Sequence, residues 1–114
     1  MKRIILFSIT LFLTMITLSS CDAFVQVKGT YTWDWRGYKQ TIIISSNASS
    51  GPCVWKGEDG ETSNKSYTLY VHSYDRPLLY IEGIACIDIN NRKVYDSASD
   101  FRAHRNGRPC TITR

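Results

Sequence analysis

The sequence predicts an all-β domain, a small antiparallel up-and-down meander of about six to eight short strands that forms either a barrel or a sandwich. Apolar and polar residues alternate along several short runs after residue 24, which is the period of a half-buried strand. Residues typical of tight turns separate these runs, and no window of helical period stands out there. Closure into a barrel would remove the exposed edges that so small a sheet would otherwise show.

The first hairpin is expected in the region that follows residue 24. Apolar, aromatic or glycine residues occupy every second position of residues 25–35, with polar residues between them. Arg36-Gly37 then supplies a turn, and residues 38–46 continue the alternation. The pattern predicts two paired strands joined by a short turn.

The middle of the chain predicts a second pair of strands. Residues 46–52 are a loop by composition, and residues 53–56 read as a short strand. Asp59-Gly60 stands where a two-residue hairpin turn would sit, and residues 66–74 form the next alternating strand.

The last third predicts further strands and several turns. Residues 78–89 read as one long strand with a bulge or sharp bend at Gly83. Short strands are expected after it, separated by turns at Asn90-Asn91 and Asn106-Gly107, over residues 94–95, 101–105 and 111–113. One helical turn within residues 95–104, capped by Ser97 or Ser99, is an alternative for that segment.

The beginning of the chain has a different character. Lys2 and Arg3 precede an apolar stretch over residues 4–18, which is shorter than the roughly 20 residues that a spanning helix needs. Small residues follow it, so residues 1–20 are expected to be a cleaved signal peptide. A retained transmembrane helix and an ordinary secretory signal cut near Ser20 are the alternatives.

The end of this segment, Leu18-Ser19-Ser20-Cys21, resembles the lipobox of bacterial lipoproteins, which has a leucine, two small residues and a cysteine. The resemblance implies that the Cys21 thiol carries a diacylglycerol and that cleavage makes Cys21 the acylated first residue. Several acyl chains would hold the protein on a bilayer, so the membrane is its expected partner.

The predicted organisation is then a signal peptide over residues 1–20, a lipidated tether over residues 21–24, and one β domain over residues 25–114. Cleavage would leave 94 residues, which suffices for one small domain. It would also remove two of the 14 cations against an unchanged 10 anions, so the net charge would fall from +4 to +2. The basic balance is therefore no footprint of a nucleic-acid partner.

The run KGTYTW followed by a turn and YKQTIIISSN, within residues 28–47, resembles the first hairpin of lipocalin-like barrel lipoproteins, which are common in the Bacteroidota. The lipocalin signature would have Trp two residues after Gly29, where this chain has Tyr31, and the mature chain is shorter than a lipocalin. The resemblance implies a small barrel, and these two departures argue against a roomy ligand cup inside it.

Cysteines also remain in the mature chain, at Cys53, Cys86 and Cys110. An oxidising envelope favours one disulfide, and spacing alone does not choose among the three possible pairings. An up-and-down order of strands brings Cys86 and Cys110 to the same end. We therefore expect a Cys86–Cys110 disulfide, although the parity of the neighbouring isoleucines does not put the two thiols on one face.

No motif indicates catalysis or a cofactor. Cys53, the adjacent His72 and Ser73, and several acidic residues are candidates by type, but none stands in a spaced signature. The cysteines and the two histidines lack the close pairs that begin a zinc site, so no metal is expected. The acidic run over residues 58–61 lacks calcium-loop spacing and reads as a solvated turn.

Aromatic residues suggest a recognition surface. Tyr31, Trp33, Trp35 and Tyr67 have the parity of core residues, which is their simplest interpretation. Tyr70, Tyr74 and Tyr80 fall on the polar face or in a turn. Because tyrosine is enriched in binding hot spots, these three are the predicted recognition patch.

The resulting functional hypothesis is a non-catalytic binding module that is anchored in the bacterial envelope and recognises a protein or a glycan there. A structural, accessory or exclusion-type lipoprotein without a small-molecule ligand is the alternative. Lipoprotein inhibitors of C-type lysozyme are a third comparison, but their Ser-Gly-x-x-Tyr loop would need Tyr where this chain has Val54 after Ser50-Gly51. The expected location is a periplasm-facing anchor, in the inner or the outer membrane.

Overall fold

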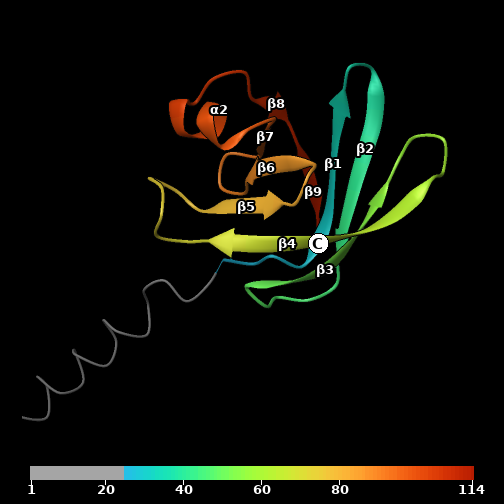
Figure 1. Ribbon diagram of the computed structural model, residues 1–114, viewed down its shortest axis with the longest axis horizontal. Helices are drawn as coiled ribbons and strands as arrows, with labels where there is room; N and C mark the ends of the chain where they lie inside the picture. The colour runs from blue at the N-terminus through green and yellow to red at the C-terminus, as the bar shows by residue number, and fades with distance from the viewer. Residues whose placement is uncertain (1–24) are drawn as a thin grey trace, which may run out of the picture.

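A computed structural model describes residues 25–114, and it confirms the predicted all-β class (Figure 1). Within these residues nine antiparallel strands follow one another in a single sheet that curls into a nearly closed barrel. The expected signal peptide, the lipobox cysteine Cys21 and the tether over residues 21–24 lie outside the described residues. In the described part no helix has the length and hydrophobicity needed to cross a membrane.

The predicted first hairpin is confirmed. Strand β1 (Gly29–Trp35) pairs with β2 (Tyr38–Ile44), and the pairing runs from Trp35 opposite Tyr38 to Gly29 opposite Ile44. The turn residues Arg36 and Gly37 have φ angles of 53° and 86°. Two consecutive positive φ values are the geometry of the tight turn that suits a twisted hairpin.

The second hairpin starts earlier than its composition suggested. Strand β3 (Ser50–Lys56) includes Ser50 to Pro52, which the sequence placed in a loop, and it pairs with β4 (Thr62–Tyr70). The full register from Ser50 opposite Thr68 to Lys56 opposite Thr62 explains the correction, because cross-strand pairing outweighs local turn propensity. The expected turn at Asp59-Gly60 lies at the tip of this hairpin.

The predicted long strand over residues 78–89 is instead a third hairpin. Strand β5 (Leu78–Ile81) ends before Gly83, and β6 (Ala85–Asp88) returns along it with Leu79 opposite Ile87. Gly83 has a φ of 74°, a left-handed conformation that glycine adopts without strain. The glycine therefore reverses the chain rather than bending one strand.

The helical alternative holds for the segment after β7 (Lys93–Tyr95). Helix α2 (Ala98–Ala103) begins at the expected cap, where the Ser97 hydroxyl accepts a hydrogen bond from the backbone N–H of Asp100 at 3.1 Å. The strand proposed over residues 101–105 is wrong, because Phe101 becomes the buried residue of this helix.

The last strands close the barrel. Strand β8 (Arg108–Pro109) pairs with β7, and after Cys110 the chain continues as β9 (Thr111–Thr113), which pairs with β1. One short segment thus contacts the strands at both ends of the sheet. This arrangement selects the barrel over the sandwich, the alternative that the sequence left open.

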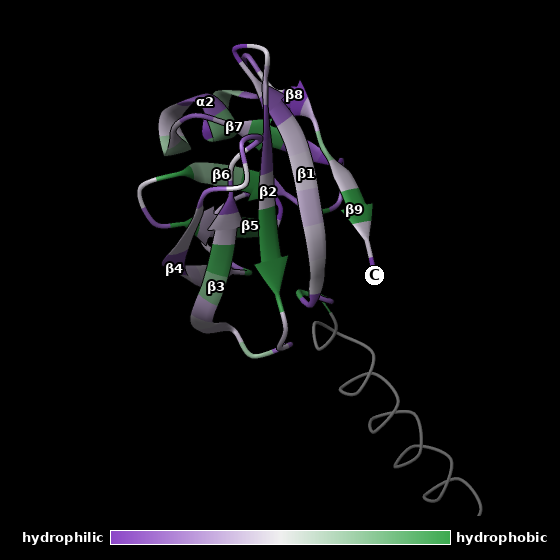
Figure 2. Cartoon of the chain, turned by 90° about the vertical axis from the view of Figure 1, so that its right-hand side faces the viewer, coloured by the Kyte–Doolittle hydropathy of each residue, from purple (hydrophilic) through white to green (hydrophobic). Residues whose placement is uncertain are grey.

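Two hydrophobic clusters lie on opposite faces of the sheet. The first fills the barrel and includes Tyr31, Trp33, Ile42 and Tyr67. The second lies outside the barrel wall beneath helix α2 and consists of Leu78, Cys86, Tyr95 and Phe101. Figure 2 shows the hydrophobic stretch of β2 in its second half, toward Ile44, while the hairpin tip is hydrophilic.

The two ends of the barrel differ. At one end, the Asn47 side-chain oxygen accepts hydrogen bonds from the N–H groups of Val27 and Lys28, at 3.0 and 2.8 Å. The Tyr31 hydroxyl donates to the Val27 carbonyl there, and the Tyr67 hydroxyl donates to the Ala48 carbonyl at 2.8 Å. We call this the closed end. The described chain starts here, at residue 25, whereas the tips of the first three hairpins lie at the opposite end (Figure 1).

Candidate functional site

The opposite end of the barrel carries two adjoining hollows, which together we call the mouth. They share Trp35 and Gln40 and have volumes of about 370 and 410 Å³. The smaller hollow, here the acidic lobe, is lined by Trp35, Tyr38, Gln40, Trp55, Gly57, Glu58, Asp59 and Glu61. The larger hollow, here the mixed lobe, is lined by Trp33, Trp35, Arg36, Gln40, Gly83, Ile84 and Asp96.

Strand periodicity places the aromatic side chains of the mouth. Trp33 and Trp35 follow the inward-facing Tyr31 at intervals of two along β1, and their cross-strand partners on β2 are Gln40 and Tyr38. Trp33 is deep enough to be buried, whereas Trp35 is 39% exposed at the rim. The assignment of Trp35 to the core is therefore wrong, because the barrel ends before this residue.

The Trp55 indole is held in place by hydrogen bonding and packing. Its Nε1–H donates to the Gln40 side-chain oxygen at 2.7 Å, across the β2–β3 pair. The ring also lies over Gly57, where an added Cβ would come within 3.0 Å of the indole. The wall of the acidic lobe is thus fixed before any ligand arrives.

The acidic run over residues 58–61 forms the other wall of this lobe. Glu58 accepts a hydrogen bond from the backbone N–H of Lys39 at 2.7 Å, which ties the β3–β4 tip to the first hairpin. The Asp59 carboxylate accepts from the backbone N–H of Glu61 at 3.1 Å. The run is exposed, as a solvated turn should be, but its position beside three aromatic rings was not predicted.

Charges in the mixed lobe are already partnered. Asp96 forms an ion pair with Arg108 at 2.8 Å, and the Arg36 guanidinium lies 4.8 Å from the centroid of the Trp35 ring. The second contact is a cation–π interaction, in which the negative face of the indole attracts the cation. The mixed lobe therefore contains charges of both signs, whereas the acidic lobe on the other side of Trp35 is lined, within residues 25–114, by acidic residues alone among the charged types.

The predicted recognition patch is only partly brought together. Tyr70 and Tyr80 are exposed, at 40% and 37%, and lie on the outer wall as diagonal neighbours of the β4–β5 pair. Tyr74 instead packs edge-to-face against Phe101, with ring centroids 5.4 Å apart, and Arg102 covers it. The patch thus reduces to two tyrosines on a wall, while Tyr74 belongs to the cluster under α2.

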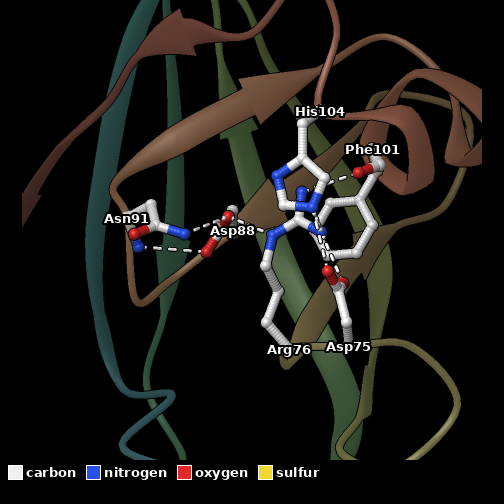
Figure 3. A network of polar contacts seen from close by, with 6 residues as sticks. All are labelled: Asp75, Arg76, Asp88, Asn91, Phe101 and His104. Carbon is white, nitrogen blue, oxygen red and sulfur yellow. Dashed lines mark hydrogen bonds and ion pairs between the residues drawn. The ribbon is translucent and has the colours of Figure 1, made fainter.

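A second group of polar side chains surrounds the buried Arg76 (Figure 3). Its guanidinium donates to Asp88, to Asp75 at 2.7 Å and to the Phe101 carbonyl at 2.6 Å, and it stacks 3.8 Å from the centre of the Phe101 ring. The arginine thereby joins the β4–β5 loop, β6 and helix α2. Every hydrogen-bonding nitrogen of the guanidinium has a partner, as a buried cation requires.

The acids of this group have perturbed ionisation. Burial by itself would raise the pKa of Asp88, but hydrogen bonds from Arg76 and from Asn91 outweigh it and hold the pKa below its usual range. Hydrogen bonds from His104 and Arg76 likewise lower the pKa of Asp75. Both carboxylates are therefore ionised at neutral pH and stabilise the arginine, which is a structural task.

Catalytic candidates are not assembled around a nucleophile in the described residues. The His104 ring nitrogen Nε2 lies 2.9 Å from Asp75 and 3.1 Å from Arg76 and has no serine, threonine or cysteine as a partner there. His72 and Ser73 are exposed in the β4–β5 loop. Within residues 25–114, no group of three or more potential ligands of the His, Cys, Asp and Glu types could hold a metal ion.

The expected Cys86–Cys110 disulfide is not formed in the structure, where Cys53, Cys86 and Cys110 are free and buried. Cys86 belongs to the cluster under α2, whereas Cys110 belongs to the barrel interior, so the sheet separates them. Burial raises the pKa of both thiols to about 11. A thiol that stays protonated at neutral pH is a poor nucleophile.

No protein-family model, curated protein or solved structure gives a significant match to this chain.

Proposed function

We propose that this protein is a lipid-anchored lipoprotein of the bacterial envelope that acts as a non-catalytic binding module and takes a protein partner at the barrel mouth. The observation that carries the proposal is the pair of aromatic-lined hollows at the end opposite residue 25. An anchor at Cys21, four residues before the described chain, would attach the closed end and leave the mouth directed away from the bilayer.

The composition of the mouth supports binding rather than simple solvation. Trp35 and Tyr38 are 39% and 61% exposed beside the more enclosed Trp55. Exposed aromatic rings are costly to leave in water and are the residue types that dominate binding hot spots. Fixed polar groups, such as the hydrogen-bonded Gln40, supply orientation in ligand sites of this kind.

The envelope location is proposed from Leu18-Ser19-Ser20-Cys21, which resembles a lipobox. We also propose that the barrel is lipocalin-like and that the anchored protein faces the periplasm. The barrel mouth replaces the tyrosine patch as the favoured surface, because two aromatic-lined hollows adjoin there. Tyr74 packs against Phe101 instead, which leaves only Tyr70 and Tyr80 of the patch exposed on the outer wall.

One capture experiment tests both halves of the proposal. The epitope-tagged protein is expressed in its host, and the membrane and soluble fractions are probed for captured proteins by mass spectrometry. We expect a saturable partner on the membrane-bound protein, lost in the Trp35→Ala/Tyr38→Ala variant and kept in Tyr70→Ala/Tyr80→Ala. The Cys21→Ala variant should leave the membrane.

Other outcomes would contradict parts of the proposal. Absence of any saturable partner would favour the structural or accessory role. An uncut Cys21→Ala precursor that stays in the membrane would instead indicate a spanning helix. Loss of the partner only in the Tyr70→Ala/Tyr80→Ala variant would move the binding surface to the wall.

A further inference from the structure

We infer that the acidic lobe binds a basic side chain, a lysine ammonium or an arginine guanidinium, displayed by the partner protein. The inference rests on the proposed binding function, because it names the chemistry that the mouth recognises. It follows from three observations, namely the aromatic walls of the lobe, carboxylates that form no ion pair in the described part of the chain, and the stacking of Arg36 on Trp35 in the adjoining mixed lobe.

Aromatic rings make up one side of the lobe. Trp35, Tyr38 and Trp55 all line it, and Gln40 fixes the Trp55 indole by the 2.7 Å hydrogen bond. The faces of tryptophan and tyrosine rings carry a negative electrostatic potential that attracts organic cations. Three such rings around one hollow of about 370 Å³ favour a cation with apolar stem atoms over a hydrated metal ion.

Carboxylates make up the other side. Glu58, Asp59 and Glu61 line the lobe, and none of them takes part in an ion pair among residues 25–114. No lysine or arginine lines the lobe, since Lys39 contributes only its backbone N–H to Glu58. Three negative charges that form no ion pair within residues 25–114 attract a cation most strongly at low salt.

The chain itself supplies an example of the expected contact. Arg36 stacks on Trp35 at 4.8 Å and lines the mixed lobe, next to the acidic lobe. This pair shows that the rim accommodates a guanidinium against an indole. The acidic lobe offers the same ring type with added carboxylates and without a resident cation.

The shape of the mouth favours a protein as the source of the cation. The acidic lobe is open to solvent, and it continues past Trp35 and Gln40 into a second hollow of about 410 Å³. A basic side chain in one lobe would therefore bring its neighbouring residues onto the other. A free small cation would leave most of this surface uncovered.

The test uses the three tryptophans as separate reporters. The chain has three tryptophans, and all of them line the mouth. Of the two lobes, Trp33 lines only the mixed lobe and Trp55 only the acidic lobe, whereas Trp35 lines both. The lipidated, nitrogen-15-labelled protein in detergent micelles is titrated with blocked Ala-Lys-Ala and Ala-Arg-Ala peptides while the indole N–H signals are recorded. The isosteric Ala-norleucine-Ala peptide is the neutral control, and choline is the free-cation control.

We expect saturable shifts of the Trp55 and Trp35 signals with the basic peptides, a smaller shift of Trp33 and none with the norleucine peptide. A Glu58→Gln/Asp59→Asn/Glu61→Gln variant should bind the basic peptides roughly tenfold more weakly. Glu82→Gln, which removes an exposed acid from the β5–β6 turn at the same end, should bind them as the unchanged protein does.

Equal shifts with the norleucine peptide, or an unchanged affinity in the triple variant, would overturn the inference. Tighter binding of choline than of either basic peptide would overturn its protein source. The capture experiment separates this failure from failure of the proposed function. If the triple variant still captures the partner and Trp35→Ala/Tyr38→Ala does not, the binding module stands and the basic side chain is rejected.

Discussion

Asp88 illustrates how a single residue can organise this small domain. It is fully buried, accepts hydrogen bonds from Arg76 and from the side chain and backbone of Asn91, and stands at the end of β6 (Figure 3). Removing two charges from water is costly, so the pair is no guarantee of net stability. Removing Asp88 alone, however, would leave the buried Arg76 with only the exposed Asp75 as a charged partner among residues 25–114, beneath helix α2.

Asp88→Asn should therefore lower the free energy of unfolding by about 3–5 kcal/mol at pH 7. The folded-state pKa of Asp88 lies below the unfolded value of about 3.9, so its contribution is present above that pH and is lost as the pH falls through the folded pKa. Urea unfolding at several pH values between 7 and 2 measures both effects.

The exposed acid Asp34 on β1 provides the control for this prediction. Asp34→Asn should change the free energy of unfolding little at pH 7. If Asp88→Asn has the stability of the unchanged protein at pH 7, or the same loss of stability on acidification, the buried ion pair does not have the importance assigned to it.

The cysteines allow a direct count. Because Cys86 and Cys110 lie on opposite sides of the sheet, Cys53, Cys86 and Cys110 should all be free thiols, with raised pKa values that make them slow to react until the protein unfolds. An Ellman titration before and after denaturation measures the number. A single free thiol among these three after denaturation would show that a disulfide exists despite this separation.

The alternation of residues along the strands already indicated that Cys86 and Cys110 face opposite sides of the sheet. Ile112 shares the parity of Cys110, and both are buried in the barrel, whereas Ile87 has the parity opposite to Cys86 and is also buried in the barrel. The order of the strands indicated only that the two cysteines share an end. A shared end does not give a shared face, because the side-chain period of two decides the face.

At the scale of elements, hairpins were predictable where turn residues and alternation agreed. The β1–β2 pair follows from strict alternation around Arg36-Gly37. The turn at Gly83 was not distinguishable from a bulge, because both use a glycine and the flanking residues are apolar on both faces. Residues on both faces of these strands are buried because α2 covers the outer face of the sheet. No local sequence pattern indicated that α2 packs there.

In the segment that follows α2, the backbone at Gly107 lies very close to the Tyr95 ring. A Cβ at Gly107 would lie 2.9 Å from two ring carbons of Tyr95, which packs edge-to-face on Phe101 at 5.6 Å between centroids. Gly107→Ala should therefore lower the free energy of unfolding by about 1–3 kcal/mol, because the tyrosine ring must shift. Thermal unfolding measures the change.

Gly51→Ala is the matched substitution for this prediction. Its added Cβ would meet the Tyr67 ring at 3.6 Å, an ordinary contact within a strand, so the change in stability should be small. Equal effects of the two substitutions would mean that the loss of glycine in general, and not the approach of Tyr95, determines the result.

For the whole molecule, barrel closure separates two ends with different properties. The closed end is filled by Tyr31 and Tyr67 and sealed by the Asn47 hydrogen bonds, while the mouth exposes aromatic rings and carboxylates. The sequence contained these aromatics, but strand pairing is needed to know which of them lie at the rim. The contact between the β3–β4 tip and the first hairpin joins residues far apart in the sequence, so local patterns could not predict it.

The most direct measurement is site-specific photocrosslinking of the protein in its living host. Replacement of Tyr38 by p-benzoylphenylalanine puts the probe at the mouth, and replacement of Tyr70, which is also exposed, puts it on the outer wall. We expect a discrete adduct from position 38 that competes with unlabelled protein, and none from position 70. Adducts only from position 70, or none from either position, would contradict a binding module that works through the barrel mouth.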